Sequence, residues 1–175
     1  MTAEYTFKVI IIGPAAVGKS SLIRRFVENK FTFEYQFTIG VDFLAKTMEY
    51  EKGRFAKLSM WDVGGQERFK FLRRSFYEGT HGALLVFDLS RAVTFQKMKD
   101  WLIDMNSIIQ KEIPMVIIGN KSDLIPDIGE VIDSEEPQKF AEQNNSLFFT
   151  TSAKNGDNVE NGFIELAQRM VKRYS

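Results

Sequence analysis

The chain has 175 residues, no cysteine and a formal net charge of zero, so it fits one domain and gives no sign of a nucleic-acid partner. The lack of cysteine excludes disulfides, cysteine-ligated zinc, cysteine nucleophiles and a prenyl or palmitoyl anchor in this chain. No apolar run reaches the roughly 18 residues that span a bilayer. We therefore expect a cytoplasmic protein, peripheral to a membrane only if a lipidated tail extends the chain.

Strand and helix patterns alternate from the N-terminus onward. Residues 7–12 form a short β-branched run that predicts a buried strand. Apolar residues then recur at helical spacing over 18–29 and predict a helix. Two alternating segments, 41–50 and 54–62, flank a turn-like Glu51-Lys52-Gly53 and predict an antiparallel hairpin.

The second half of the chain continues this alternation. Residues 83–87 and 115–118 read as buried strands, and a long amphipathic helix is predicted between them. A last strand is predicted at 147–150, after a helix near 134–145. A terminal helix follows, with its apolar stripe beginning at Val159.

This order of elements predicts an α/β fold in one domain, residues 1–175. We expect a six-stranded, mostly parallel sheet with one antiparallel edge strand from the hairpin and helices on both faces. Ligands of such sheets bind beyond the carboxyl ends of the strands. Residues 125–133, rich in acids with a proline and a glycine, are predicted to form a surface loop.

A phosphate-binding motif connects the first strand to the first helix. Residues 13–20 read Gly-Pro-Ala-Ala-Val-Gly-Lys-Ser and match the pattern G-x-x-x-x-G-K-[ST]. Backbone N–H groups and the positive end of a helix meet a phosphate there. Lys19 would reach the β- and γ-phosphates, and the Ser20 hydroxyl would bind Mg²⁺. The alternative is a glycine-rich turn that binds nothing.

Asp62 closes the strand predicted at 54–62. A carboxylate at the end of an apolar strand is costly unless something pairs with it. Beside a phosphate loop we expect it to support Mg²⁺, directly or through water. The alternative is a residue that caps a turn.

Two further strand ends predict a guanine site. Asn120-Lys121-Ser122-Asp123 follows the strand at 115–118, and a carboxylate can accept both N–H donors of guanine N1 and N2. Adenine offers no matching pair, which argues against a P-loop kinase or ATPase. Thr151-Ser152-Ala153-Lys154 follows the last strand and would bring backbone N–H groups to the base oxygen.

With these motifs in this order, the chain resembles the Ras-superfamily small GTPases over nearly its whole length. The segments 39–43, 57–62, 66–69 and 75–77 resemble the Rab branch. The resemblance implies a P-loop G-domain that binds GTP and Mg²⁺ and hydrolyses GTP to GDP and phosphate. It also implies a molecular switch of vesicle trafficking that works with an exchange factor, a GTPase-activating protein and effectors.

The resemblance also implies the roles of individual residues. The catalytic group is Gln66, which orients water, with Lys19 and Thr38. The phosphate-binding residues are Ala15, Ala16, Val17, Gly18, Lys19, Ser20, Ser21 and Gly65. The Mg²⁺ ligands are Ser20, Thr38 and, through water, Asp62. The guanine-binding residues are Phe31, Asn120, Lys121, Asp123, Ser152, Ala153 and Lys154. The effector surface is Phe43, Trp61 and Phe76, for which a partly exposed extension of the core is the alternative.

Some features separate this chain from its relatives. Val63-Gly64 stands where Rab proteins usually carry Thr-Ala, so the second switch gains backbone freedom. Ala16 would carry strain if its φ were positive. No arginine is obviously placed to act in cis, so we expect slow hydrolysis that a partner accelerates. The alternative function is a GTP-binding scaffold with negligible turnover.

Overall fold

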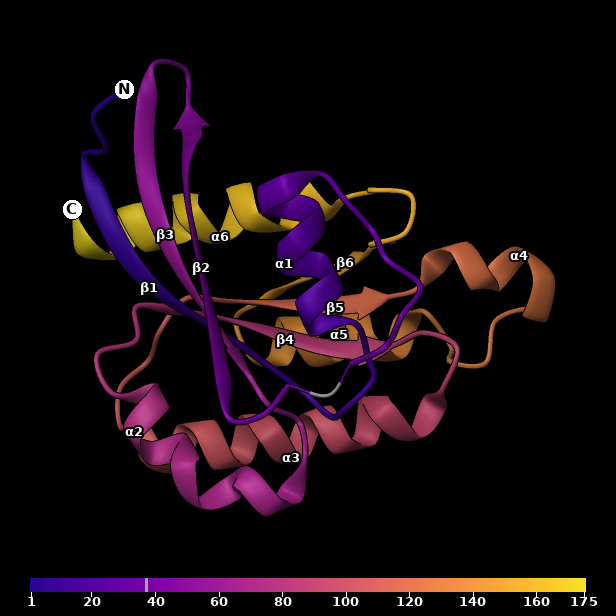
Figure 1. The fold of residues 1–175 in the computed structure, drawn as a ribbon. Helices are drawn as coiled ribbons and strands as arrows, with labels where there is room; N and C mark the ends of the chain where they lie inside the picture. The colour runs from indigo at the N-terminus through magenta and orange to yellow at the C-terminus, as the bar shows by residue number, and fades with distance from the viewer. Residues whose placement is uncertain (37) are drawn as a thin grey trace.

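The computed structural model describes residues 1–36 and 38–175, and its strands form one twisted sheet (Figure 1). The strand order is β2-β3-β1-β4-β5-β6. β2 runs antiparallel to β3, and every other neighbouring pair is parallel. This confirms the predicted sheet, including the antiparallel edge strand. The strands are β1 (Tyr5–Ile12), β2 (Val41–Glu51), β3 (Arg54–Val63), β4 (Gly82–Asp88), β5 (Met115–Asn120) and β6 (Leu147–Thr150).

Helices cover both faces of this sheet (Figure 1). Apolar side chains of α1 and α6 pack on one face, and those of α2, α3 and α5 pack on the other. The predicted helices are therefore confirmed on both faces. The predicted helices are α1 (Lys19–Glu28), α3 (Ala92–Ile108), α5 (Glu135–Gln143) and α6 (Val159–Tyr174). The structure adds two short helices that the sequence did not predict, α2 (Arg73–Tyr77) and α4 (Ile125–Ile128).

The central strand β1 shows how the sequence pattern builds this core. Val9 and Ile11 pack toward α1 and α6, whereas Ile10 and Ile12 pack toward α3. Successive side chains of a strand point to opposite faces, so a strand covered on both sides needs a continuous apolar run. None of these side chains is exposed to solvent.

The segment after β5 differs from the predicted surface loop. Residues 122–124 form a 3-10 turn, and Ile125–Ile128 form the short helix α4. Pro126 lies in the first turn of α4, where its missing N–H is not needed. The N–H of Gly129 bonds to the Ile125 carbonyl, and its φ of 78° ends the helix. The loop prediction was wrong for 125–128.

The carboxyl ends of β1, β3, β4, β5 and β6 lie along one edge of the sheet because these strands are mutually parallel. This edge carries the phosphate motif, Asp62, the base motif and residues 151–154. Across the described residues, the helices are too short or too polar to cross a lipid bilayer.

Candidate functional site

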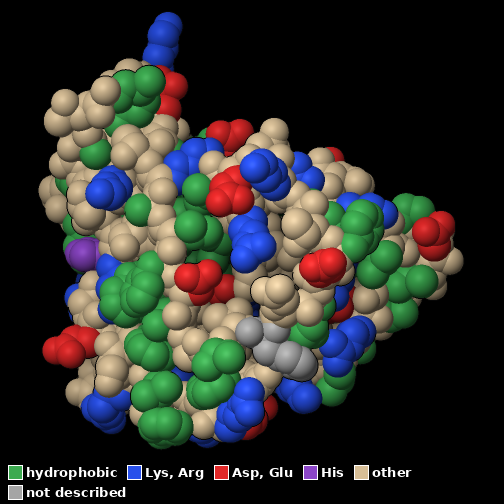
Figure 2. All heavy atoms as spheres, in the orientation of Figure 1, with side chains coloured by type: hydrophobic (Ala, Val, Ile, Leu, Met, Phe, Trp, Pro, Cys, Tyr) green, Lys and Arg blue, Asp and Glu red, His purple; other side chains and the backbone are tan. Residues whose placement is uncertain are grey.

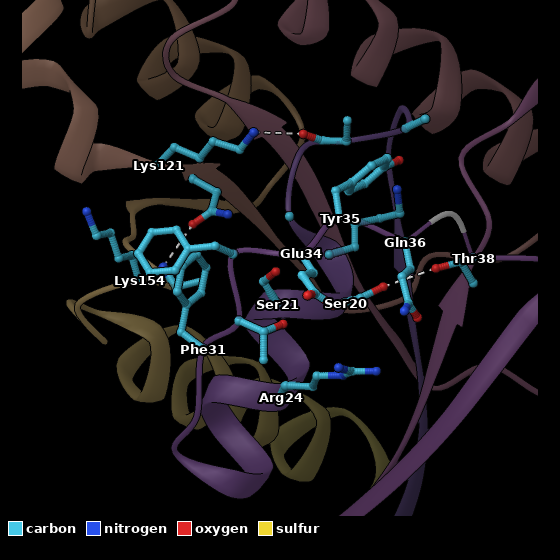
Figure 3. A pocket seen from close by; sticks show the side chains of 18 of the residues that line it. Ser20, Ser21, Arg24, Phe31, Glu34, Tyr35, Gln36, Thr38, Lys121 and Lys154 are labelled. Atoms are coloured by element: carbon cyan, nitrogen blue, oxygen red, sulfur yellow. Dashed lines mark hydrogen bonds between the residues drawn. The ribbon is translucent and has the colours of Figure 1, made fainter.

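A cleft of about 790 Å³ opens at this edge of the sheet (Figure 3). The cleft is lined by most of the residues that the sequence predicts to bind a nucleotide: Ala15, Ala16, Gly18, Lys19, Ser20, Ser21, Phe31, Thr38, Gly65, Gln66, Asn120, Lys121, Asp123, Ala153 and Lys154. Val17, Asp62 and Ser152 do not line it, because their side chains are buried behind its wall. The structure thus brings three separate motifs to one cavity.

The phosphate loop has a backbone that few side chains tolerate. Gly18 has a φ of 97°, and a Cβ added there would lie 2.3 Å from Asn120 Nδ2. Ala16 has a φ of 65°, the left-handed region that favours glycine. The strain foreseen for Ala16 is therefore present. Asn120 Nδ2 also donates to the Val17 carbonyl at 3.0 Å, which joins the loop to the end of β5.

Lys19 begins α1 and is almost fully buried. Its Nζ donates to the carbonyls of Gly13 and Pro14 at 2.9 and 2.8 Å, which holds it against the phosphate loop. Burial lowers the pKa of Lys19 to about 8, the nearby Asp62 carboxylate raises it, and Arg73 lowers it further. A phosphate beside this lysine would favour its charged form.

Three oxygen-bearing side chains meet beside Lys19. Ser20 Oγ donates a hydrogen bond to Asp62 Oδ2, and Thr38 Oγ1 donates to the same atom at 3.3 Å. The two hydroxyl oxygens lie 3.1 Å apart (Figure 3). Burial raises the pKa of Asp62, while Lys19 and the two hydroxyls oppose that rise. These side chains come from α1, β3 and the segment before β2.

This oxygen cluster fits a hard divalent cation. Asp62 Oδ1 is buried and has no hydrogen-bond partner among the described residues. Within 1–36 and 38–175, no group of three or more His, Cys, Asp or Glu side chains could hold a metal. A cation here would therefore need hydroxyl and phosphate oxygens, which are the ligands that Mg²⁺ prefers.

The other end of the cleft carries the predicted base site. Asp123 Oδ1 accepts a hydrogen bond from Ser152 Oγ at 2.8 Å, which orients the carboxylate. Asn120 Oδ1 accepts from Thr151 Oγ1 at 3.0 Å and from the Ala153 N–H at 3.3 Å. Ser152 thus supports the base site by orienting Asp123, although its own side chain is buried and does not face the cleft.

An aromatic wall closes this end of the cleft. The rings of Phe31 and Phe33 meet edge to face, with their centroids 5.1 Å apart. The ammonium group of Lys154 lies 5.4 Å from the Phe33 ring. Figure 3 shows Phe31 and Lys154 side by side, at the far end from Thr38. A planar ligand could stack here between apolar and cationic groups.

The segment after β3 approaches the phosphate loop very closely. A Cβ added at Gly65 would lie 2.4 Å from the Ala15 backbone nitrogen, so only glycine fits. The N–H of Gly64 donates to the Gly40 carbonyl at 2.8 Å. Gln66 lines the cleft directly beyond these two glycines. The water-orienting residue expected from the sequence is thus within the cavity.

The predicted effector residues form one cluster outside the cleft. The rings of Phe43 and Trp61 meet edge to face with centroids 4.4 Å apart, and Phe76 lies 6.5 Å from Trp61. Phe43 is 54% exposed, and Ile39 and Phe71 are also highly exposed. Figure 2 shows hydrophobic side chains gathered over β2 and α2, at the lower left.

Some residues of the cleft belong to none of the motifs recognised in the sequence. Arg24 lines it, one helical turn after Ser20 on α1, so an arginine does lie in the cavity. Residues four apart lie on the same face of a helix, so the spacing from Ser20 could have predicted that Arg24 faces the cleft. Tyr35 also lines the cleft. No motif in the sequence points to Tyr35.

Comparison with known proteins agrees with this geometry. Residues 8–172 match the family model described as the Ras family. Human Ras-related protein Rab-4A is 38% identical over 172 residues, which cover 98% of this chain and 78% of that protein. Ras-related protein Rab-4B of Rattus norvegicus is also 38% identical over 172 residues, covering 98% and 79%. The chain belongs to the Ras family and is a Rab-like molecular switch that binds and hydrolyses GTP.

Proposed function

We propose that the cleft holds GTP with its phosphates on residues 13–21 and its base at Asp123. The observation that carries this proposal is that Lys19 and Asp123 line one and the same cavity. The backbone of 15–21 and the N–H of Gly65 would bind phosphate oxygens, with Lys19 Nζ as the cationic partner. The four-carbon stem of Lys19 lets its ammonium group turn from the loop carbonyls to a phosphate.

The Mg²⁺ site of this proposal consists of Ser20, Thr38 and Asp62. Its support is Asp62 Oδ1, which has no partner among the described residues, and the two hydroxyls that face the same carboxylate. Bound Mg²⁺ would neutralise negative charge on the phosphate oxygens. Ser20 and Thr38 would hold the ion directly, and Asp62 would hold it through water.

Guanine is the base that fits the proposed site. The Asp123 carboxylate would accept the N1 and N2 protons, and the backbone N–H groups of Ala153 and Lys154 would face the base oxygen. Phe31 would pack across the ring. Asn120 and Lys121 would hold the phosphate loop against this end of the cleft, as their hydrogen bonds to Val17 and Ala16 support.

For hydrolysis we propose in-line attack of water on the γ-phosphorus. Gln66 would orient that water, and Lys19 with the loop N–H groups would stabilise charge on the phosphate oxygens. Catalysis would thus come from position and electrostatics, with no covalent intermediate. Turnover without a partner should be slow, at about 10⁻⁴ s⁻¹, and an activating protein should raise it by about 10³–10⁵.

The switch would follow from the same contacts. The γ-phosphate would hold Thr38 in the segment 31–42, of which residue 37 lies outside the described residues, and Gly65 in the segment 64–78. Loss of the γ-phosphate would release both segments. An effector that reads Phe43, Trp61 and Phe76 beside them would distinguish the two nucleotide states. As part of this proposal, the protein would act at vesicle membranes together with an exchange factor and effectors.

The alternative that the sequence left open is a GTP-binding scaffold without turnover. Slow chemistry was expected because the recognised motifs contain no cis-acting arginine, yet Arg24 does line the cleft. Gln66 and Thr38 both line the cleft, which favours hydrolysis. The two candidates differ in whether phosphate is ever released from bound GTP.

Asp123→Asn tests the base site. The amide would replace an acceptor by an N–H donor, so GTP affinity should fall by more than about tenfold. Xanthosine triphosphate should gain affinity, because its 2-oxo group can accept that N–H. Asp127→Asn on the exposed α4 is the matched control. Unchanged selectivity in Asp123→Asn would contradict the proposed base site.

A further inference from the structure

Arg25 lies on α1 and does not line the cleft, yet its guanidinium binds the loop that does. Nε donates to the Ala153 carbonyl at 2.8 Å, and Nη2 donates to the Lys154 carbonyl. Nη1 donates to the backbone and side-chain oxygens of Asn29, at 3.2 and 3.1 Å. The side chain is half-buried between these two segments.

The two segments joined by Arg25 are the two walls of the base site. Ala153 and Lys154 line the cleft on one side. Asn29 ends α1 in the left-handed conformation, with φ of 54°, and its N–H bonds back to the Arg25 carbonyl at 3.0 Å. The chain then turns directly into Phe31, the aromatic wall on the other side.

Arginine suits this place better than any other residue. Its planar fork carries five N–H donors in fixed directions, so one side chain can satisfy carbonyls from two segments at once. Lysine and glutamine offer fewer donors and no such fork. The stem of Arg25 packs beside Gly156, where an added Cβ would make an ordinary van der Waals contact with Arg25 Cδ at 3.6 Å.

We propose that Arg25 is a positioning residue that retains bound guanine nucleotide. By fixing the backbone of 153–154 relative to 29–31, it keeps the base site assembled and slows nucleotide release. This role rests on the proposed mode of guanine binding, since Arg25 itself touches only the walls. The hydrolysis step lies at the other end of the cleft and does not depend on it.

The test is the rate of release of GDP that carries a fluorescent group on its ribose. Arg25→Gln should release GDP about tenfold faster than wild type, which corresponds to about 1.4 kcal/mol. Arg25→Lys should fall between the two. Arg169→Gln is the matched control, because Arg169 also donates to a side chain and a backbone carbonyl, on α6 away from the cleft. Its release rate should equal that of wild type.

The release of a second nucleotide distinguishes a specific effect on the position of the base from a general loss of rigidity in the site. The diphosphate of 2-aminopurine riboside keeps the 2-amino group but lacks both the 6-oxo group that would face Ala153 and Lys154 and the N1 proton that would face Asp123. Arg25→Gln should therefore accelerate its release less than it accelerates the release of GDP.

Specific results would overturn the inference. Release of GDP from Arg25→Gln at the wild-type rate, or equal acceleration for both nucleotides, would exclude a positioning role for Arg25 while leaving the guanine site intact. A wild-type chain that retains neither nucleotide would contradict the proposed site itself, and the role of Arg25 with it.

Discussion

The ammonium group of Lys121 lies 3.0 Å from the carboxylate of Asp88 and donates to the Ala16 carbonyl at 2.8 Å. Asp88 ends β4, and its side chain is only 1% exposed. Its other oxygen accepts from the N–H and hydroxyl of Ser90. One lysine therefore joins the end of β4 and the base motif to the strained phosphate loop.

Asp88→Asn should weaken this junction. The amide cannot match the charge of Lys121, so the free energy of unfolding should fall by about 2 kcal/mol. Urea denaturation at a fixed GDP concentration measures the change, because bound nucleotide adds to stability. Asp127→Asn on the exposed α4 should change it by less than about 0.5 kcal/mol. Equal stability of the two variants would show that the buried pair is not needed.

Gly64→Ala should separate the two switch segments. The sequence suggested that this glycine adds backbone freedom, but the structure gives it a packing role. A Cβ here would lie 2.8 Å from the Thr38 carbonyl oxygen and 3.0 Å from that of Gly40. Amide hydrogen exchange of residues 38–42 should therefore become faster. In the control Gly162→Ala, the Cβ would meet only the Ile118 side-chain tip at 3.2 Å, and exchange of 38–42 should not change.

Arg73→Ala should detach α2 from α3. The guanidinium is buried, stacks 3.5 Å from the Trp101 ring centre and lies 3.1 Å from the Asp104 carboxylate. Loss of these contacts should lower the free energy of unfolding by about 2–3 kcal/mol. The exposed neighbour Arg74 offers a matched control, and Arg74→Ala should have little effect. Similar losses in both variants would exclude a specific role for the Arg73 contacts.

Acid should destabilise the protein through His81, the chain's only histidine. Its Nδ1 accepts from the Lys8 N–H at 2.9 Å. Burial, with Lys111 and Lys8, lowers the pKa of His81 below its ordinary value of 6.5. Between these two pKa values the unfolded chain binds more protons than the folded one. The stabilisation is thus complete above pH 6.5 and is lost as the pH falls from there toward the folded pKa.

The free energy of unfolding at about pH 7.5 and about pH 5.5 measures this effect. His81→Asn keeps a possible acceptor for Lys8 but does not titrate, so its loss of stability over this range should be smaller. An identical loss in wild type and variant would assign the pH dependence to other groups.

Much of the site follows from the sequence because its chemistry lies at strand ends. Buried runs predict the strands, and parallel strands must end together, so Lys19, Asp62 and Asp123 are expected at one edge. No local sequence pattern predicts the hydrogen bonds that join these motifs to one another. The Arg25–Ala153 and Lys121–Ala16 bonds join residues more than 100 positions apart. The helix α4 escaped prediction because four residues are too few to show a helical period.

The most direct test of the account is the fate of guanine nucleotide on the purified protein. Bound nucleotide is identified by chromatography, and the protein is then loaded with GTP in Mg²⁺ and followed for phosphate through a single turnover. We expect bound GDP or GTP, slow conversion of GTP to GDP at about 10⁻⁴ s⁻¹, and a further loss of rate in Gln66→Leu. Bound GTP that is never cleaved would contradict the proposed hydrolysis and favour the scaffold.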